Sequence, residues 1–354
     1  MGAVSLERIA EAADHLMTAP VSNWSILKGI PLRELYLAAR EHAGGPLALA
    51  ASRLLLERVR PGDCVLFLSG FIIRDYQRPE TDGPVGAAVL ARALSVGVGA
   101  VPVGVCEPAS AAVFEACLAC AGLVPGPPAD LRVGRHRCAV VPFPLDPAEA
   151  EERAAALLDE LRPAAVVAVE RPGANRRGRY HAGGGFDISA FTAKTDALFA
   201  RARARGIATV GVGDLGNELG MGVVAEQVRK SVANGDRCEC PCQGGIAVEL
   251  PADVAVIANI SNWGAHAVAA CLAVILRNEA AFHSGEEERR LIEASVRAGA
   301  VDPVGGLLRP YVDGTDAATN AAFVDLLRHL VLLAVRGGGD VEAYRASWHD
   351  GKRS

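Results

Sequence analysis

The chain alternates between short apolar runs and longer stretches with helical spacing. The runs contain almost no polar residue and show no alternation of apolar with polar positions; they cover residues 64–70, 100–105, 138–143, 164–170, 208–213 and 254–260. Strands that are buried on both faces carry this pattern, which is typical of parallel sheets. The stretches with helical spacing predict helices at 85–96, 108–121, 147–161, 188–205, 222–233 and 264–279.

Residues at the ends of these stretches favour the same elements. Asp82 with Pro84, and Asp146 with Pro147, are typical of helix starts. Gly206 follows an arginine-rich turn and is typical of a helix end. Repeated strand–helix units imply right-handed crossovers. We therefore predict an α/β fold: an open doubly wound, mainly parallel sheet of about six strands, with helices on both faces and extra N- and C-terminal helices.

The sequence predicts a single α/β domain over residues 1–336, because no long proline- or serine-rich linker divides it. Residues 1–60 are expected to be a helical N-terminal addition and residues 61–280 the sheet core. Residues 281–336 are expected to form C-terminal helices. The polar, glycine-rich segment 337–354 is predicted to be a flexible tail.

The composition of the chain argues against several classes of function. The chain has 354 residues and is 51% hydrophobic. Its formal net charge of −5 does not favour binding to the negatively charged nucleic acids. No signal peptide and no uninterrupted apolar stretch of about 18 residues is seen, so we expect no membrane span. Because no signal peptide is seen, we expect the nine cysteines to be reduced thiols in a cytoplasmic protein. The residue bias suggests a bacterial source, and the sequence is compatible with a homo-oligomer.

Polar residues gather in the long loops that follow the strands, which is the edge where open parallel sheets bind ligands. The candidate residues in these loops are Arg78, Glu80 and Asp82, then Arg171, Asn175 and Tyr180, and finally Asn262 and Trp263. Each also has a purely structural alternative. Asp82 could cap the next helix, some arginines could be solvated, and Trp263 could be a core aromatic residue.

The loop "GVGDLGNELGMG" (residues 211–222) contains the spacing G-x-G-x-x-G of dinucleotide-binding proteins. That fingerprint belongs on the first strand, whereas here it follows the fifth, and Asp214 would face a pyrophosphate. We therefore expect no nucleotide cofactor. Gly213 and Gly216 instead offer space and bare N–H groups to a compact substrate, and Asp214, Asn217 and Glu218 become candidates for chemistry.

The segment "CECPC" holds Cys238, Cys240 and Cys242. Structural zinc sites usually space their cysteines by two to four residues and require a fourth ligand. This segment lacks that pattern, and His181 shows no partner at metal-ligand spacing. A turn with free thiols is the favoured interpretation, with metal binding as the alternative.

Several motifs occur in an order that resembles the D-glutamate cyclase family. They are "SGF", "PETDGPVGA", "ERPGAN" with "GRY", "GVGDLGNELGMG", "SNWGAHA" and "VDGT", spread over about residues 60–335. Two features depart from the family pattern: Leu215 stands where the family usually has glycine, and the stretch around Asp302 is less regular. The resemblance implies a carbon–oxygen lyase that closes D-glutamate, a small acidic amino acid, to 5-oxo-D-proline with loss of water.

The candidate residues suit that chemistry. Arg171, and then Arg78, would bind a substrate carboxylate, and Glu218 or Asp214 would take a proton from the amine. Asn217 and Asn262 are candidate oxyanion donors. The acceptor carboxylate requires a protonated acid, a cluster of donors, or a divalent metal such as Mg²⁺ or Mn²⁺ bound by Asp214, Glu218, Glu80 and Asp82. The alternatives are a metal-dependent hydrolase or phosphotransferase and a non-catalytic sensor of small acidic metabolites.

Overall fold

The computed structural model describes residues 5–21 and 29–337. Its main sheet has seven strands in the order β5-β6-β4-β1-β7-β8-β9, and every pairing is parallel. The predicted fold class is confirmed, with one strand more than expected. The strands are β1 (Cys64–Ser69), β4 (Val101–Cys106), β5 (Val124–Pro125), β6 (Arg137–Pro142), β7 (Ala165–Val169), β8 (Ala208–Gly213) and β9 (Val254–Ile257). The extra strand, β5, is two residues long, too short to leave a pattern in the sequence.

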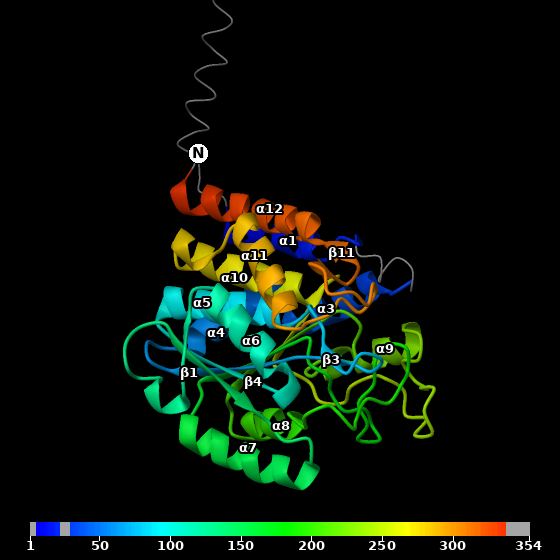
Figure 1. The fold of residues 1–354 in the computed structure, drawn as a ribbon. Coiled ribbons are helices and arrows are strands. Elements are labelled where there is room, and N and C mark those ends of the chain that lie inside the picture. Colours follow the sequence, from blue (N-terminus) through cyan, green and yellow to red (C-terminus); the bar gives the residue numbers. More distant parts are fainter. Residues whose placement is uncertain (1–4, 22–28, 338–354) are drawn as a thin grey trace, which may run out of the picture.

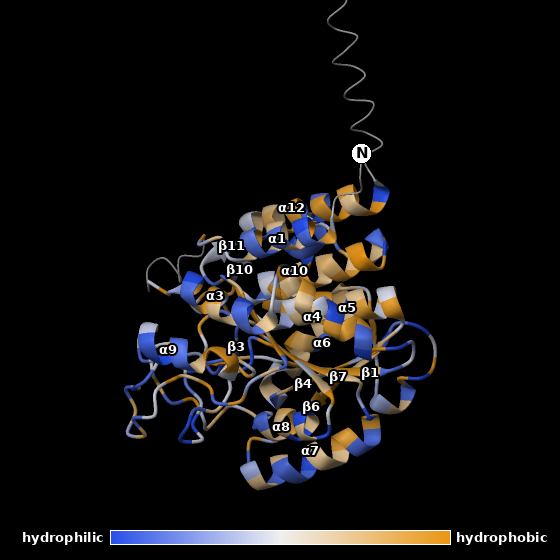
Figure 2. Ribbon diagram, turned by 180° about the vertical axis from the view of Figure 1, so that it is seen from behind, coloured by the Kyte–Doolittle hydropathy of each residue, from blue (hydrophilic) through white to orange (hydrophobic). Residues whose placement is uncertain are grey.

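Helices cover both faces of this sheet (Figure 1). On one face lie α7 (Pro147–Leu161) and α8 (Asp196–Ala204); on the other lie α4 (Leu47–Arg58), α5 (Pro84–Val98), α6 (Ala111–Cys120) and α10 (Ser261–Ile275). The side chains of β1 alternate between the two layers. Leu66 and Leu68 pack in the cluster with α7 and α8, whereas Val65 and Phe67 pack in the larger cluster on the opposite face. Figure 2 shows the apolar strands between the two helical layers.

A further layer is added by helices from the two ends of the described chain: α1 (Leu6–Met17), α11 (Gly285–Arg297) and α12 (Ala317–Arg336). Helix α3 (Leu32–Ala43) instead packs against β9 at the edge of the sheet. The larger apolar cluster runs from Ala10 to Val331 and so includes side chains of the added helices. The remaining elements are short: β2 (Ile72–Ile73), β3 (Arg78–Pro79), η1 (Pro108–Ser110), η2 (Pro128–Asp130), η3 (Gly222–Val224), α9 (Ala225–Ser231), η4 (Glu279–Ala281), β10 (Tyr311–Val312) and β11 (Thr315–Asp316). The predicted tail lies, from residue 338 on, outside the described residues.

The helix predicted over residues 188–205 is wrong in its first part. Residues 188–195 are irregular, and α8 begins only at Asp196. In this segment backbone N–H groups bond to distant residues: Ala193 to the Glu107 carboxylate at 3.1 Å, and Lys194 to the Pro144 carbonyl at 3.0 Å. These donors are therefore not used in helical hydrogen bonds.

Helix α12 is, within residues 5–21 and 29–337, the one helix long and apolar enough to cross a membrane, judged by length and composition. In the structure it packs along α10 and α11. Asp325 accepts a hydrogen bond from the Gly285 backbone N–H at 2.8 Å, which fixes α12 against the start of α11.

The order of the strands creates a crevice between β1 and β7. The chain leaves β1 toward β4, β5 and β6 on one side, and after β6 it crosses to β7 on the other side. The loops after β1 and β7 therefore diverge above the carboxyl ends of neighbouring strands. Such a topological switch point is where open α/β sheets bind ligands.

A buried carboxylate joins three helices of the N-terminal part. Helix α4 has Pro46 at its N-cap and no capping side chain of its own. Asp14, on α1, accepts hydrogen bonds from the backbone N–H groups of Leu47 at 2.6 Å and Ala48 at 3.1 Å. The Tyr36 hydroxyl on α3 also donates to Asp14, at 2.9 Å. Burial raises the pKa of Asp14, and these hydrogen bonds oppose that rise.

We expect Asp14→Ala to lower the free energy of unfolding by about 2–4 kcal/mol, because three buried donors lose their acceptor. The matched control is Glu7→Ala, which removes an exposed ion pair with Arg53 and should leave the free energy of unfolding nearly unchanged. Denaturant unfolding of both variants measures the difference. Equal losses would show that the buried contact carries no special weight.

Candidate active site

A pocket of about 240 Å³ opens at the switch point. The loops after β1, β7 and β8 line it, together with the turn of the β10–β11 hairpin. Most of its ionisable lining residues are acidic, and Arg74 is the one cation among the described residues that line it. The acidic lining residues are Asp75, Glu80, Glu170, Asp214 and Asp313.

Two side chains hold α5 and α10 together behind this pocket. Asp82 accepts hydrogen bonds from the Ser261 N–H at 2.9 Å and the Asn262 N–H at 2.8 Å, at the start of α10. Asn262 Oδ1 in turn accepts from the Gly83 N–H at 2.9 Å and the Gly86 N–H at 2.6 Å, at the start of α5. Each helix thus supplies the cap of the other, and α10 begins earlier than predicted. Asn262 was expected to bind substrate. Its amide oxygen instead accepts hydrogen bonds from backbone N–H groups at the start of α5.

Three buried carboxylates converge beside these helix starts. Asp82, Glu170 and Asp214 each place one oxygen within 4.8 Å of the others. Burial, followed by repulsion from neighbouring carboxylates, raises the pKa of Glu170 and of Asp214 well above the usual range. Burial raises the pKa of Asp82 to about 6, although backbone N–H groups favour its charged form. The cluster therefore binds protons readily, and its oxygen ligands are also the type that Mg²⁺ or Mn²⁺ prefers.

Two further acids face the same cluster. Burial, and then repulsion from other carboxylates, raises the pKa of Glu80 and of Asp313 well above their usual range. One oxygen of Glu80 is buried and has no hydrogen-bond partner within the described chain, and the same holds for Asn217 Oδ1. Both residues line the pocket. Buried polar atoms normally have partners, so these two atoms mark positions for a ligand or water.

The structure thus brings the expected residues Glu80, Asp214 and Asn217 to the pocket wall, with Asp82 directly behind. The sequence reasoning gave no role to Glu170 and Asp313. Both have left-handed backbone conformations, with φ of 42° and 49°. That conformation is costly for residues other than glycine and is often found at functional sites. The sequence feature that could have indicated them is their place in motifs shared with the family: Glu170 lies in "ERPGAN" and Asp313 in "VDGT".

Glu218 has a different role from the one expected. Its carboxylate is fully buried and accepts the N–H groups of Asp214 at 3.1 Å, Leu215 at 2.9 Å and Gly216 at 2.7 Å. It occupies the backbone donors that a phosphate-binding loop would offer to a phosphate. Glu218 was expected, as an alternative to Asp214, to be the base. Both of its oxygens accept backbone N–H groups and it does not line the pocket, so we infer a structural role for it instead. It fixes the loop that carries Asp214.

The glycines of this loop serve Glu218 and the turn. A Cβ atom at Gly213 would lie 2.6 Å from the Glu218 carboxylate. Gly216 has a φ of +99°, and a Cβ there would lie 2.2 Å from Val228. Neither glycine is among the residues that line the pocket, so the expected contact of Gly213 and Gly216 with substrate is not supported.

Arg171 was expected to bind a substrate carboxylate, and the structure places it in the interior, outside the pocket lining. Its guanidinium is fully buried and pairs with Glu107 at 2.6 Å. It also donates to the carbonyls of Gly70 at 2.9 Å and Ala193 at 2.7 Å, and to Thr195 Oγ1 at 2.9 Å. With its donors satisfied in this way, Arg171 ties together loops that surround the pocket and does not line it.

Trp263 and Tyr180 also lie in the interior, away from the lining. The Trp263 ring stacks on Phe323 with centroids 4.1 Å apart, and its indole N–H donates to Asn320 at 2.9 Å. Trp263 is therefore a core aromatic residue, as its structural alternative proposed. Tyr180 is buried in a small apolar cluster with Ile188. Their expected role in substrate binding is not supported.

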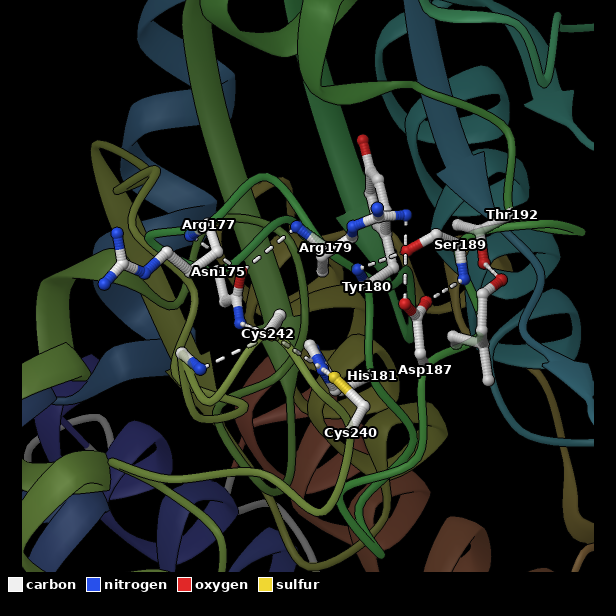
Figure 3. A network of polar contacts seen from close by, with 12 residues as sticks. Asn175, Arg177, Arg179, Tyr180, His181, Asp187, Ser189, Thr192, Cys240 and Cys242 are labelled. Carbon is white, nitrogen blue, oxygen red and sulfur yellow. Dashed lines mark hydrogen bonds and ion pairs between the residues drawn. The ribbon is translucent and has the colours of Figure 1, made fainter.

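Asn175 and Arg78 are likewise outside the pocket lining. The Asn175 side-chain oxygen accepts the N–H groups of Arg177 at 2.9 Å and Arg179 at 3.0 Å, which shapes its own loop (Figure 3). Arg78 lies exposed on β3. The cation that does line the pocket is Arg74, which sequence reasoning did not single out. Its guanidinium lies 4.2 Å from the Phe186 ring centre.

We predict that Glu218→Gln destabilises the fold, because an amide N–H₂ then faces backbone donors. The expected loss is about 2–4 kcal/mol in the free energy of unfolding. Glu226→Gln, at an exposed ion pair with Lys230, is the control and should leave the free energy of unfolding nearly unchanged. If Glu218→Gln kept full stability, the loop-holding role would be wrong and the base role would be restored.

The raised pKa values predict that stability depends on pH. A carboxyl group whose pKa is raised on folding stabilises the native state below its unfolded pKa, and this contribution is lost as pH rises through the folded pKa. Without divalent cations, Glu170→Gln should therefore gain stability relative to the unmodified chain as pH rises from about 5 to about 8. Thermal unfolding of both proteins across this range measures the gain. A constant difference would show that Glu170 ionises normally.

Comparison with known proteins identifies the family of this chain. The profile of the family described as D-glutamate cyclase-like, C-terminal, matches residues 37–328. A stretch of 111 residues is 40% identical to human "D-glutamate cyclase, mitochondrial"; it covers 31% of this chain and 17% of that protein. The chain thus spans only a small part of the human relative's length. The family match, in contrast, extends over most of the chain and confirms the resemblance of the motifs: the chain belongs to the D-glutamate cyclase-like, C-terminal family.

Proposed function

We propose that this chain is a lyase that converts D-glutamate to 5-oxo-D-proline and water. The observation that supports it best is the acidic pocket at the switch point, where the buried Glu80 oxygen has no partner within the described chain. A pocket of about 240 Å³ suits a small metabolite rather than a nucleotide cofactor. Membership of the D-glutamate cyclase-like family supports this choice of reaction and of the D configuration.

The reaction requires that protons move over a short distance. The amine nitrogen attacks the side-chain carboxyl carbon, a C–N bond forms and a C–O bond breaks. The ammonium group gives up two protons in all, and both leave in the water molecule with one carboxylate oxygen. A buried acid that takes a proton from nitrogen and returns it to oxygen can carry out this exchange, and a raised pKa helps it to hold the proton in between. Glu80 is the best candidate, because of its free oxygen and raised pKa.

An acidic pocket must also accept an acidic substrate. The substrate carries two carboxylates, which the ionised cluster would repel. Protons on the cluster would remove that repulsion, and so would a divalent cation. Asp82, Glu170 and Asp214 fit such a cation, since they offer three buried oxygen ligands within 4.8 Å of one another. When bound, a divalent cation would neutralise the acceptor carboxylate and make its carbon more electrophilic.

The remaining polar groups suit substrate binding. Asn217 donates its amide N–H to the His181 carbonyl at 3.0 Å, which turns its free oxygen toward the pocket as an acceptor. A substrate ammonium group is a fitting donor to that oxygen. Arg74, with its partly exposed guanidinium, can bind the α-carboxylate at the pocket mouth.

The test is incubation of the purified chain with D- or L-glutamate, with EDTA or with added Mn²⁺, followed by chromatographic detection of oxoproline. We expect turnover of D-glutamate, and EDTA separates the proton and cation alternatives. Glu80→Gln should lower kcat at least about 100-fold with little change in KM. Glu115→Gln, on the exposed side of α6, is the matched control and should keep the normal rate.

Each rival function has its own outcome. Binding of D-glutamate in calorimetry without product would indicate a sensor of acidic metabolites. Metal-dependent release of phosphate from a small phosphorylated acid, with no oxoproline, would indicate a hydrolase. Neither binding nor turnover of either glutamate enantiomer would contradict the proposed reaction.

A further inference from the structure

A second group of metal-ligating side chains lies outside the carboxylate cluster and uses different chemistry. His181, in the loop after β7, meets Cys238, Cys240 and Cys242, which follow α9. Their ligand atoms all lie within 4.8 Å of one another. We propose that these four residues bind a structural zinc ion in a tetrahedral Cys₃His site.

The distances between ligand atoms match such a site. His181 Nε2 lies 3.2 Å from the Cys240 sulfur and 3.7 Å from the Cys242 sulfur. The Cys238 sulfur lies 3.5 Å from that of Cys240 and 3.3 Å from that of Cys242. Tetrahedral zinc with ordinary Zn–S and Zn–N bonds separates its ligand atoms by about 3.6–3.8 Å. Figure 3 shows His181, Cys240 and Cys242 turned toward one another.

Disulfide formation explains these positions less well. A disulfide places two sulfur atoms about 2 Å apart and leaves the third thiol and the histidine without a role. In the structure all nine cysteines are free, and Cys238 is almost equidistant from its two neighbours. Four ligand atoms directed to one point are the arrangement that zinc requires.

Polar groups beside the cluster donate hydrogen bonds to sulfur. The Asn175 side-chain amide donates to the Cys242 sulfur at 3.6 Å. Cys242 additionally accepts from the Gly244 N–H at 3.4 Å. Donors of this kind stabilise thiolates around a metal.

The site would hold one wall of the candidate active site. The residues next to His181 (Ala182, Gly183 and Gly184) line the pocket. The carbonyl of Gly185 accepts the Glu239 N–H at 3.1 Å, between two of the cysteines. Zinc would therefore fix two distant segments, around residues 181–186 and 238–245, into one rigid wall. This role does not depend on which reaction the pocket catalyses.

The direct test is metal analysis of the full chain purified without chelator. We expect about one zinc per chain, released as a mercurial reagent titrates the thiols. Cobalt substitution should give the absorption bands of tetrahedral cobalt–thiolate. Cys238→Ser and Cys242→Ser should each lower the zinc content at least about 10-fold. Cys120→Ser, at an exposed cysteine outside the cluster, should leave it unchanged.

His181→Cys provides a second test if the serine variants fail to fold. Its four cysteines still form a zinc site, so the variant should retain about one zinc ion per chain. Hydrogen exchange of residues 181–186 should become faster when zinc is removed and recover when it is restored. A metal-free chain with freely reactive thiols would overturn the proposal. So would a disulfide within the cluster, or exchange rates that do not respond to zinc.

Discussion

The reciprocal capping of α5 and α10 is the constraint on which the site depends. Asp82 bonds the first N–H groups of α10, and Asn262 bonds those of α5, so neither helix can shift alone. Both helices thereby direct their positive N-terminal ends toward the carboxylate cluster, where they favour negative charge. Ser261, in the first turn of α10, also donates to Glu170 at 2.6 Å. The contact that joins the helices therefore also positions the acids.

The cluster of buried carboxylates destabilises the folded state. Buried carboxylates that face one another are destabilising when all are charged, which is why their pKa values are raised. Groups elsewhere in the site supply the rigidity that holds them. The buried Arg171–Glu107 pair ties the surrounding loops, and Glu218 fixes the loop of Asp214 through backbone donors. Residues that looked like ligand binders in the sequence are thus the supports that keep unfavourable charges in place.

The same distinction explains why several expected site residues lie outside the pocket lining. Arg171, Asn262 and Glu218 are polar residues in loops at the correct edge of the sheet, and in the sequence they cannot be told apart from residues facing a ligand. What separates them is the partner of each atom. Glu80 and Asn217 have buried atoms without partners within the described chain. The oxygens of Glu218 accept N–H groups of its own loop, whereas Arg171 and Asn262 bond groups distant in the sequence. His181 similarly lies 57 residues before Cys238, too far for any spacing rule to connect them.

The sequence by itself determined the α/β class, six of the seven strands, most of the helices, and the sheet edge that carries the site. It could do so because apolar periodicity and helix-end signals are local properties, and because parallel strands place their carboxyl ends together. Only the tertiary structure decided which polar residues face the pocket, how the two helices cap each other, and where a fourth ligand meets the cysteines. These features depend on contacts between segments that are distant along the chain, and the polarity of a residue does not reveal which partner it has.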